Sequence, residues 1–274
     1  PRYSLFLSLQ GGVQRIVETI SERLSGRVDL HLSTAVSKIT LEQEVWRVET
    51  AKQEVLEADA LCLALPSYEA ARLVEPFARD LASSLAQITY ESVVTVNLAY
   101  RSKDIPPIPQ GFGFVVPRLE RKKIIGCTFS SVKYPHRAPE GFILIRAFLG
   151  GALQKEVFGL SDIALQQAVE EELREILGIK VRPYLSWTNR FAKSMPQYQV
   201  GHLDLVQRIQ AQLENYPGLY LTGNAYTGIG IPDCINAAQK TAEQMEKILF
   251  SETESLSFPG LTGESSFGFP LSRE

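Results

Sequence analysis

Apolar residues recur at steps of three and four from about Asp233 to residue 249, the pattern of a helix with one buried face. The helix follows a short apolar strand at residues 219–221 and a loop that carries three glycines. We therefore predict a strand, a glycine-rich loop and a helix in direct succession. The stripe predicted to be buried consists of Ile235, Ala238, Ala242, Met245 and Leu249.

A second helix of this kind is predicted after Gly11 and Gly12, with Gly26 as its terminator. A strand at 28–32 and a hairpin over 45–57 follow it. The continuous apolar run at residues 59–65 is typical of a parallel strand buried on both faces. The apolar face expected for this helix consists of Val13, Ile16, Val17, Ile20 and Leu24.

The pattern changes after residue 67. Two short helices precede a series of strands separated by Pro- and Gly-rich turns, and a helix at 162–177 has Ser161 as its N-cap and Gly178 as its terminator. We expect an antiparallel sheet with helices on one side. Its strands are predicted at 93–100, 113–116, 123–130, 142–149 and 182–191. The buried face of the helix is predicted to be Leu165, Val169, Leu173 and Ile176.

The predicted fold class is therefore α/β with an α+β insertion. Residues 1–67 and 196–250 are assigned to the α/β domain, and residues 68–195 form the inserted domain. A helix at 202–213 returns the chain to the α/β domain. Residues 251–274 are rich in Ser, Gly and Pro without periodicity, and we predict a disordered tail there.

Composition limits the classes of function. With 274 residues, 45% apolar residues and a net charge of −3, the chain has the composition of a globular protein and offers no strong electrostatic case for nucleic acid. Its three cysteines and three histidines lack the spacing of a metal site, so none is expected. No signal peptide or long apolar span is found, and we expect a cytoplasmic protein. A basic run at 118–123 leaves peripheral membrane contact open, and a homodimer is also left open.

The strand, glycine loop and helix suit a cofactor. Free N–H groups in the first helical turn and the helix dipole favour an electron-rich group, and glycine lets a flat ring approach the backbone. The same residues are consistent with an ordinary turn whose glycines have positive φ. Glycine spacing alone does not decide between the two.

The whole run GLYLTGNAYTGIGIPDCINAA at 218–238 resembles the C-terminal flavin-binding signature of the protoporphyrinogen/coproporphyrinogen oxidase family. This family is a branch of the FAD-dependent amine oxidase and phytoene desaturase group. Further matches are the runs at 11–14, 111–117, 126–131 and 148–151. The resemblance covers nearly all of residues 3–248, and it implies a doubly wound FAD-binding domain that carries an antiparallel-sheet substrate domain.

No G-x-G-x-x-G motif follows an early strand in this sequence, although a flavoprotein of this group needs one to bind the FAD pyrophosphate. We therefore expect a C-terminal portion with an incomplete FAD-binding domain. The resemblance places the family's propionate-binding arginine upstream as well.

The resemblance also assigns residues to the cofactor. It implies that backbone groups of Val36 hold the adenine, that Trp187 lies near the isoalloxazine, and that Asn224 faces the ribityl chain where amine oxidases carry an acidic residue. The N–H groups around Gly230 would contact flavin N1 and O2. The complete set expected to bind FAD is Val36, Trp187, Gly223, Asn224, Ile229, Gly230 and Ile231.

The substrate wall implied by the resemblance consists of Phe112, Gly113, Val115 and Phe148. Strand alternation by itself points Phe112 and Phe114 the same way and is equally consistent with two core residues. A large apolar tetrapyrrole needs apolar and aromatic walls with few polar groups.

The activity implied by the resemblance is FAD-dependent oxidation of protoporphyrinogen IX or coproporphyrinogen III, with dioxygen as acceptor, in haem biosynthesis. The flavin carries that chemistry, so no catalytic acid–base pair is expected. The alternatives are an amine oxidase, a phytoene-desaturase-like flavoenzyme or an inactive truncated fragment. The sequence does not choose between the two porphyrinogens.

Overall fold

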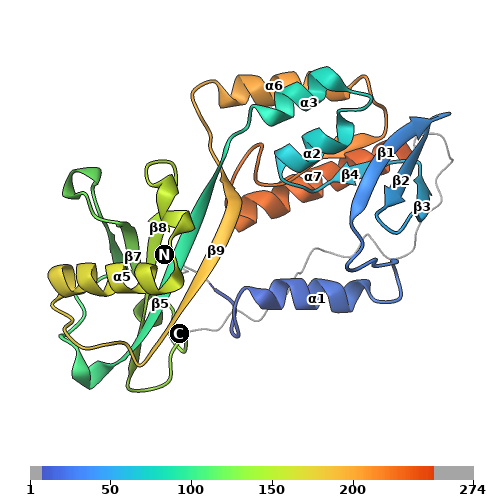
Figure 1. Ribbon diagram of the computed structural model, residues 1–274. Coiled ribbons are helices and arrows are strands. Elements are labelled where there is room, and N and C mark those ends of the chain that lie inside the picture. The colour runs from blue at the N-terminus through green and yellow to red at the C-terminus, as the bar shows by residue number, and fades with distance from the viewer. Residues whose placement is uncertain (1–7, 250–274) are drawn as a thin grey trace. The chain divides into compact units, whose positions relative to one another are not determined.

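The chain folds into two compact units in the computed structural model, which describes residues 8–249 (Figure 1). The first unit contains Ser8 and Tyr90–Met195. The second contains Leu9–Thr89 and residues 196–249. Residues 68–89, which the sequence pattern assigns to the inserted domain, lie in the second unit, and the division into domains stays a prediction. The predicted tail at 251–274 lies outside the described residues.

The first unit is built on a five-stranded sheet in the order β6-β7-β8-β5-β9. Neighbouring strands along β6-β7-β8-β5 are antiparallel, and β9 also runs against β5, because Tyr184 N bonds Ala99 O and Gln197 N bonds Thr89 O. The strands are β5 (Tyr90–Arg101), β6 (Gly113–Val115), β7 (Ile124–Phe129), β8 (Phe142–Gly150) and β9 (Leu185–Pro196). The helical segments are η1 (Ser102–Asp104), η2 (Arg118–Glu120), α4 (Ser130–Lys133), η3 (Lys155–Gly159) and α5 (Asp162–Leu177).

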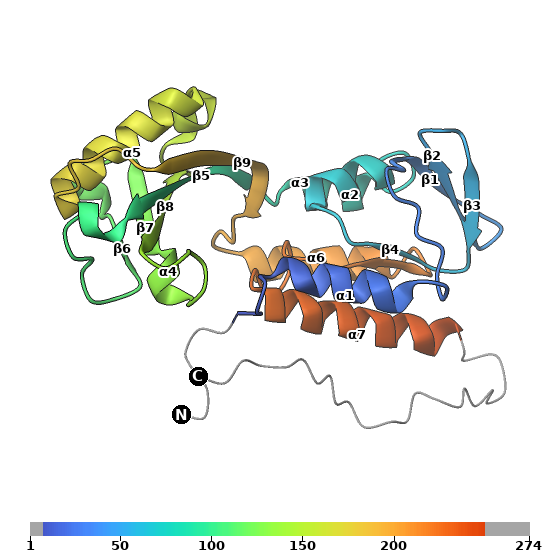
Figure 2. The same cartoon turned by 90° about the horizontal axis from the view of Figure 1, so that it is seen from below.

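Alternation along the strands gives this sheet one face that α5 covers and an opposite face that no long helix among the described residues of this unit covers, called the uncovered face below. Helix α5 packs on the covered face, while the short helix α4 lies on the other side (Figure 2). The α5 N-cap is the predicted one, since the Ser161 hydroxyl accepts from Ala164 N at 3.2 Å. The core between sheet and helix includes Val94, Val96, Leu98, Ile145, Ala147, Leu149, Leu165, Val169 and Leu173. Ile176, predicted to be buried, is exposed at the end of the helix.

The second unit combines a small meander, a pair of parallel strands and five helices within its described residues. The antiparallel meander is β1 (Val36–Glu42), β2 (Val45–Thr50) and β3 (Val55–Ala58), and the parallel pair is β4 (Leu61–Leu63) and β10 (Leu219–Leu221). The helices are α1 (Gln14–Leu24), α2 (Ser67–Val74), α3 (Arg79–Ala86), α6 (His202–Leu213) and α7 (Ile231–Leu249).

Trp46 on β2 links the meander to the turn that precedes β10. Its side chain is fully buried, its Nε1 donates to Pro217 O at 3.0 Å, and its ring packs against Phe77 at 5.8 Å. The predicted parallel strand is confirmed, but β4 has three residues and is not fully buried on both faces. The described residues thus contain two parallel strands, fewer than a doubly wound sheet has.

Three apolar segments of this unit differ from the predictions. Helix α7 turns Cys234, Ala237, Thr241 and Met245 inward, whereas Ile235, Ala238, Ala242 and Leu249 of the predicted stripe are exposed. Helix α1 has no buried residue, although its apolar periodicity is present. Residues 28–32 form no strand, because a strand requires a hydrogen-bonded neighbour and none of the described segments supplies one. Periodicity identifies an apolar face, but burial depends on an element that covers it.

The packing of α5 can be tested with two substitutions on the same helix. Leu165 is fully buried and Ile163 is 69% exposed. We expect Leu165→Ala to lower the free energy of unfolding by about 2–5 kcal/mol, because it leaves a cavity, and Ile163→Ala to change it by less than about 0.5 kcal/mol. Urea unfolding followed by circular dichroism measures both changes. Equal effects of the two substitutions would contradict the described packing.

Candidate flavin and substrate sites

The glycine loop joins β10 to α7 at the carboxyl end of a parallel strand. Strand β10 ends at Leu221, Thr222 N then bonds Leu63 O at 3.3 Å, and α7 begins at Ile231. Ligands of open α/β sheets bind in this position, outside the carboxyl ends of the strands. The helix that follows has 19 residues, so its first turn carries the positive end of a long dipole.

Two aromatic side chains hold the loop in shape. Tyr198 precedes α6, and His202 is the first residue of that helix. The Tyr198 hydroxyl donates to Asn224 O at 2.8 Å and accepts from Gly228 N at 2.9 Å. The Tyr198 ring stacks on His202 at 3.9 Å, and His202 Nε2 lies 2.9 Å from Tyr226 O. Sequence reasoning missed both residues, since His202 was treated only as a metal ligand that lacked partners. The single available signal was that His202 follows Gly201 at the start of a predicted helix.

The side chain of Asp233 is a sufficient reason for glycine at positions 228 and 230, so no ligand is needed to explain these two residues. A Cβ built on Gly228 would lie 2.5 Å from the Asp233 Cβ, and one built on Gly230 would lie 2.8 Å from Asp233 Oδ2. The same Oδ2 accepts a long hydrogen bond of 3.3 Å from Gly230 N. Pro232 removes a further donor from the first turn of α7. A flavin oxygen at Gly230 N would therefore compete with Asp233.

Gly223 is different, and it is the residue that best fits a flat ligand. Its φ is +128°, a value that favours glycine, and a Cβ built on it would meet nothing within 4 Å. Ile229 and Ile231 are exposed on the same loop. An open backbone surface beside a helix N-terminus fits the ring and its electron-rich edge, so the residues present are compatible with a flavin.

The loop brings together five of the seven residues expected to bind FAD: Gly223, Asn224, Ile229, Gly230 and Ile231. Val36 opens β1 in the same unit, and its carbonyl accepts from Arg72 Nη2 at 3.4 Å. Trp187 lies on β9 in the first unit. The loop is thus the part of the expected flavin site that the second unit assembles by itself.

The register of the first unit's sheet aligns the expected substrate residues. Val115 on β6 pairs with Gly126 on β7, which pairs with Phe148 on β8. In the adjacent row, Gly113 pairs with Thr128. Directly opposed residues of antiparallel strands point to the same face, and the residues between them belong to the core, so these rows lie on the uncovered face.

Phe112 and Phe114 have different environments. Phe114 packs on the core against Phe129 with ring centroids 6.1 Å apart, whereas Phe112 is 47% exposed. Gly113, whose φ is +151°, lies between them, and a Cβ there would come within 2.0 Å of Cys127 O. Gly113 therefore allows β6 to lie close to β7. The alternative that both phenylalanines are core residues fails for Phe112.

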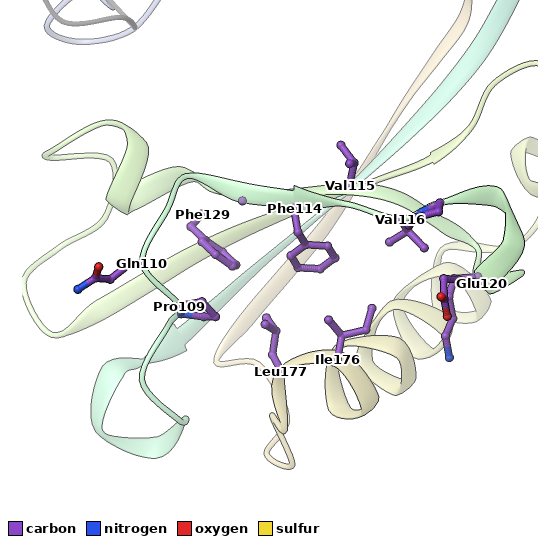
Figure 3. A pocket seen from close by; sticks show the side chains of 12 residues that line it. Pro109, Gln110, Phe114, Val115, Val116, Glu120, Phe129, Ile176 and Leu177 are labelled. Carbon is purple, nitrogen blue, oxygen red and sulfur yellow. The ribbon is translucent and has the colours of Figure 1, made fainter.

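A pocket of about 440 Å³ lies on the covered side of this sheet, and its lining includes Gly113 and Val115 of the expected substrate wall but neither Phe112 nor Phe148. Phe114 and Val116 form one wall and Ile176 and Leu177 at the end of α5 form another, while Val115 points away (Figure 3). On the same core face, burial raises the pKa of the Cys127 thiol to about 12, so this cysteine is protonated at neutral pH.

The described residues offer few features of other functional sites. Residues 8–249 contain no cluster of three or more His, Cys, Asp or Glu side chains that could hold a metal ion. In the same residues, no helix combines the length and the apolar character that crossing a membrane requires. Within the basic run at 118–123, the Lys122 ammonium pairs with Glu175 of α5.

The architecture of a meander, parallel strands, a glycine loop and an antiparallel sheet covered by a helix is that of FAD-dependent oxidoreductases. Residues 2–245 match the family described as flavin containing amine oxidoreductase. This chain therefore belongs to the flavin containing amine oxidoreductase family.

Individual relatives carry porphyrinogen oxidase names. Coproporphyrinogen III oxidase of Bacillus subtilis is 32% identical over 90% of this chain and 52% of its own length. Protoporphyrinogen oxidase of Homo sapiens is 30% identical over 86% of this chain and 50% of its own length. A crystal structure from Exiguobacterium sp. 255-15, named "Putative protoporphyrinogen oxidase", has a TM-score of 0.77 at 34% identity and covers 86% of this chain and 51% of its own. The chain spans about half the length of the curated relatives that it matches.

Tyr198 offers a test of how the loop is held. We expect Tyr198→Phe to lose both hydrogen bonds while it keeps the stacking on His202, so that the amide of Gly228 exchanges with solvent at least about tenfold faster. Hydrogen exchange measured by NMR or mass spectrometry reports this change. Tyr220→Phe is the matched control, since the Tyr220 hydroxyl has no hydrogen-bond partner among the described residues. Unchanged exchange in Tyr198→Phe would show that other contacts fix the loop.

Proposed function

We propose that this chain is part of an FAD-dependent porphyrinogen oxidase that converts protoporphyrinogen IX or coproporphyrinogen III to the porphyrin, with dioxygen as the acceptor. The observation that carries the proposal is the strand register of the first unit. It aligns Gly113 and Val115 of β6 with Phe148 of β8, across the intervening strand β7, on the uncovered face of the sheet. The names of the relatives support the same reaction.

The uncovered face has the chemistry that a tetrapyrrole needs. Val115 is 82% exposed and Phe148 is half-buried, and Gly126, which pairs with both, has no side chain. A flat or saddle-shaped macrocycle gains contact with apolar and aromatic side chains there and loses water from its own apolar edge. The role of these residues is to bind and orient the ring.

The loop between β10 and α7 would hold the flavin ring in the second unit. When bound, the flavin supplies the redox chemistry, in which hydrogens leave the substrate in two-electron steps. Gly223 would lie against the ring, Asn224 could hydrogen-bond a ribityl hydroxyl, and the N-terminus of α7 would stabilise negative charge at the ring's pyrimidine edge. Tyr198 and His202 would keep the loop in shape without contact with the reacting atoms.

The activity is tested in a protein that joins this chain to a segment with the pyrophosphate-binding motif. We expect it to oxidise coproporphyrinogen III or protoporphyrinogen IX, followed by porphyrin absorbance, with oxygen uptake, and to leave primary amines unchanged. Phe148→Ala should raise KM for the porphyrinogen because it removes apolar contact worth about 1–3 kcal/mol, with little change in flavin content. Ile163→Ala, on the opposite side of this unit, is the control and should behave as the wild type. Oxidation of amines without oxidation of porphyrinogens would overturn the proposal.

The flavin assignment is tested by two glycines that both have a positive φ. Gly223 and Gly141 both have positive φ and open space where a Cβ would lie. Valine is therefore strained at both positions, but only Gly223 belongs to the loop proposed to hold the ring. In the joined protein, we expect Gly223→Val to weaken FAD binding at least about tenfold, or roughly 1.4 kcal/mol, and Gly141→Val to retain it. Flavin absorbance after gel filtration measures both, and equal retention would remove Gly223 from the site.

A further inference from the structure

A single arginine lies in the centre of the uncovered sheet face. Arg146 on β8 pairs with Thr128 on β7 and with Asn97 on β5, in the row next to Val115, Gly126 and Phe148. Alternation along β8 puts Leu144 and Phe148 on the same face as Arg146. The guanidinium is exposed and has apolar neighbours on both sides along its own strand.

A buried asparagine orients this guanidinium. Asn97 is 0% exposed, and its Oδ1 accepts from Arg146 Nε at 2.8 Å. Its Nδ2 has no hydrogen-bond partner among the described residues. A buried amide with an unsatisfied donor costs free energy. The presence of Asn97 at this position is therefore explained by its hydrogen bond to Arg146, not by the stability of the strand. Since only Nε is tethered, the two terminal nitrogens of Arg146 extend from the sheet in a fixed direction.

Those terminal nitrogens are not used by the described protein. Within residues 8–249, the Arg146 side chain forms no ion pair, and its only hydrogen bond is the one to Asn97. Other arginines with a bonded Nε behave differently. Arg47 pairs with Glu42 and Glu57, and Arg72 pairs with Glu69. Arg146 therefore presents a planar pair of donors, which match the two oxygens of a carboxylate.

We propose that Arg146 binds a peripheral carboxylate of the substrate and that Asn97 positions it. The inference rests on the proposed function and names the group on this face that recognises the acidic side chains of a tetrapyrrole. The ring would cover Val115 and Phe148, while one carboxylate would reach Arg146 in the adjacent row. Partial exclusion of water by the ring strengthens the ion pair. The contact favours substrates with free carboxylates over neutral ones of the same shape.

The test compares the binding of two stable porphyrins to the purified 274-residue chain. Coproporphyrin III and its tetramethyl ester, in the same mild detergent, are titrated by porphyrin fluorescence, and the carboxylate preference is the ratio of Kd for the ester to Kd for the free acid. We expect Arg146→Gln to lower this ratio at least about tenfold, as for the loss of a charge-assisted bidentate pair. Arg146→Lys should give an intermediate ratio, because an ammonium keeps the charge and loses the fork.

Asn97→Asp tests the positioning role with almost no change in shape. Its carboxylate would pair with Arg146 and compete with the ligand, so the ratio should fall although Arg146 is still present. Arg174→Gln, on the exposed face of α5, is the matched control and should leave the ratio unchanged. Thermal unfolding confirms that each variant is folded.

The outcomes distinguish a failure of the role proposed for Arg146 from a failure of the proposed function. If wild type and Arg146→Gln have the same carboxylate preference while both bind porphyrin, Arg146 has no role in recognition and the proposed function stands. If the wild-type chain binds neither porphyrin, this inference is overturned, and the activity of the joined protein decides the proposed function. If Arg146→Gln lowers the ratio and Asn97→Asp does not, the positioning role of Asn97 is rejected.

Discussion

The register of five hydrogen-bonded strands is the constraint on which the first unit depends. Each strand alternates its side chains, and the register assigns every residue to the face under α5 or to the uncovered face. Gly113 permits the close approach of β6 to β7 at one edge, since any side chain there would overlap Cys127 O. A shift of one residue on β8 would move Arg146 and Phe148 into the core, and Ala147 would take their place outside.

The constraint on the second unit is different, because its functional loop is rich in glycine and has few side chains of its own to hold it in place. Glycines lack the contacts that hold most loops, so the fixing groups come from elsewhere in the chain. The Tyr198 hydroxyl bonds the loop backbone at Asn224 and Gly228, and His202 bonds it at Tyr226. This support leaves the other side of the loop, at Gly223, open for a ligand. The unit therefore keeps the surface proposed to receive the cofactor accessible and well defined without bulky residues there.

Local signals in the sequence predicted much of this structure. Helices α5 and α6 have the predicted bounds, because apolar periodicity and terminal residues such as Ser161 and Gly178 act within a few residues. The predicted inward face of α7 was wrong except at Met245, since Cys234, Ala237 and Thr241 are small or polar and contribute little to an apolar stripe. Among the functional residues, Arg146 was unnoticed because its importance comes from Asn97, 49 positions away. Tyr198 and His202 were missed for the same reason, since their contacts are tertiary.

The central claim is that the uncovered face of the sheet, with Arg146 at its centre, receives a carboxylated tetrapyrrole. A crystal structure of the flavin-loaded protein with bound coproporphyrin III tests it most directly. The account predicts that the macrocycle lies over Gly113, Val115 and Phe148, with one carboxylate at Arg146. A macrocycle in the pocket beneath Phe114, against Ile176 and Leu177, would contradict it.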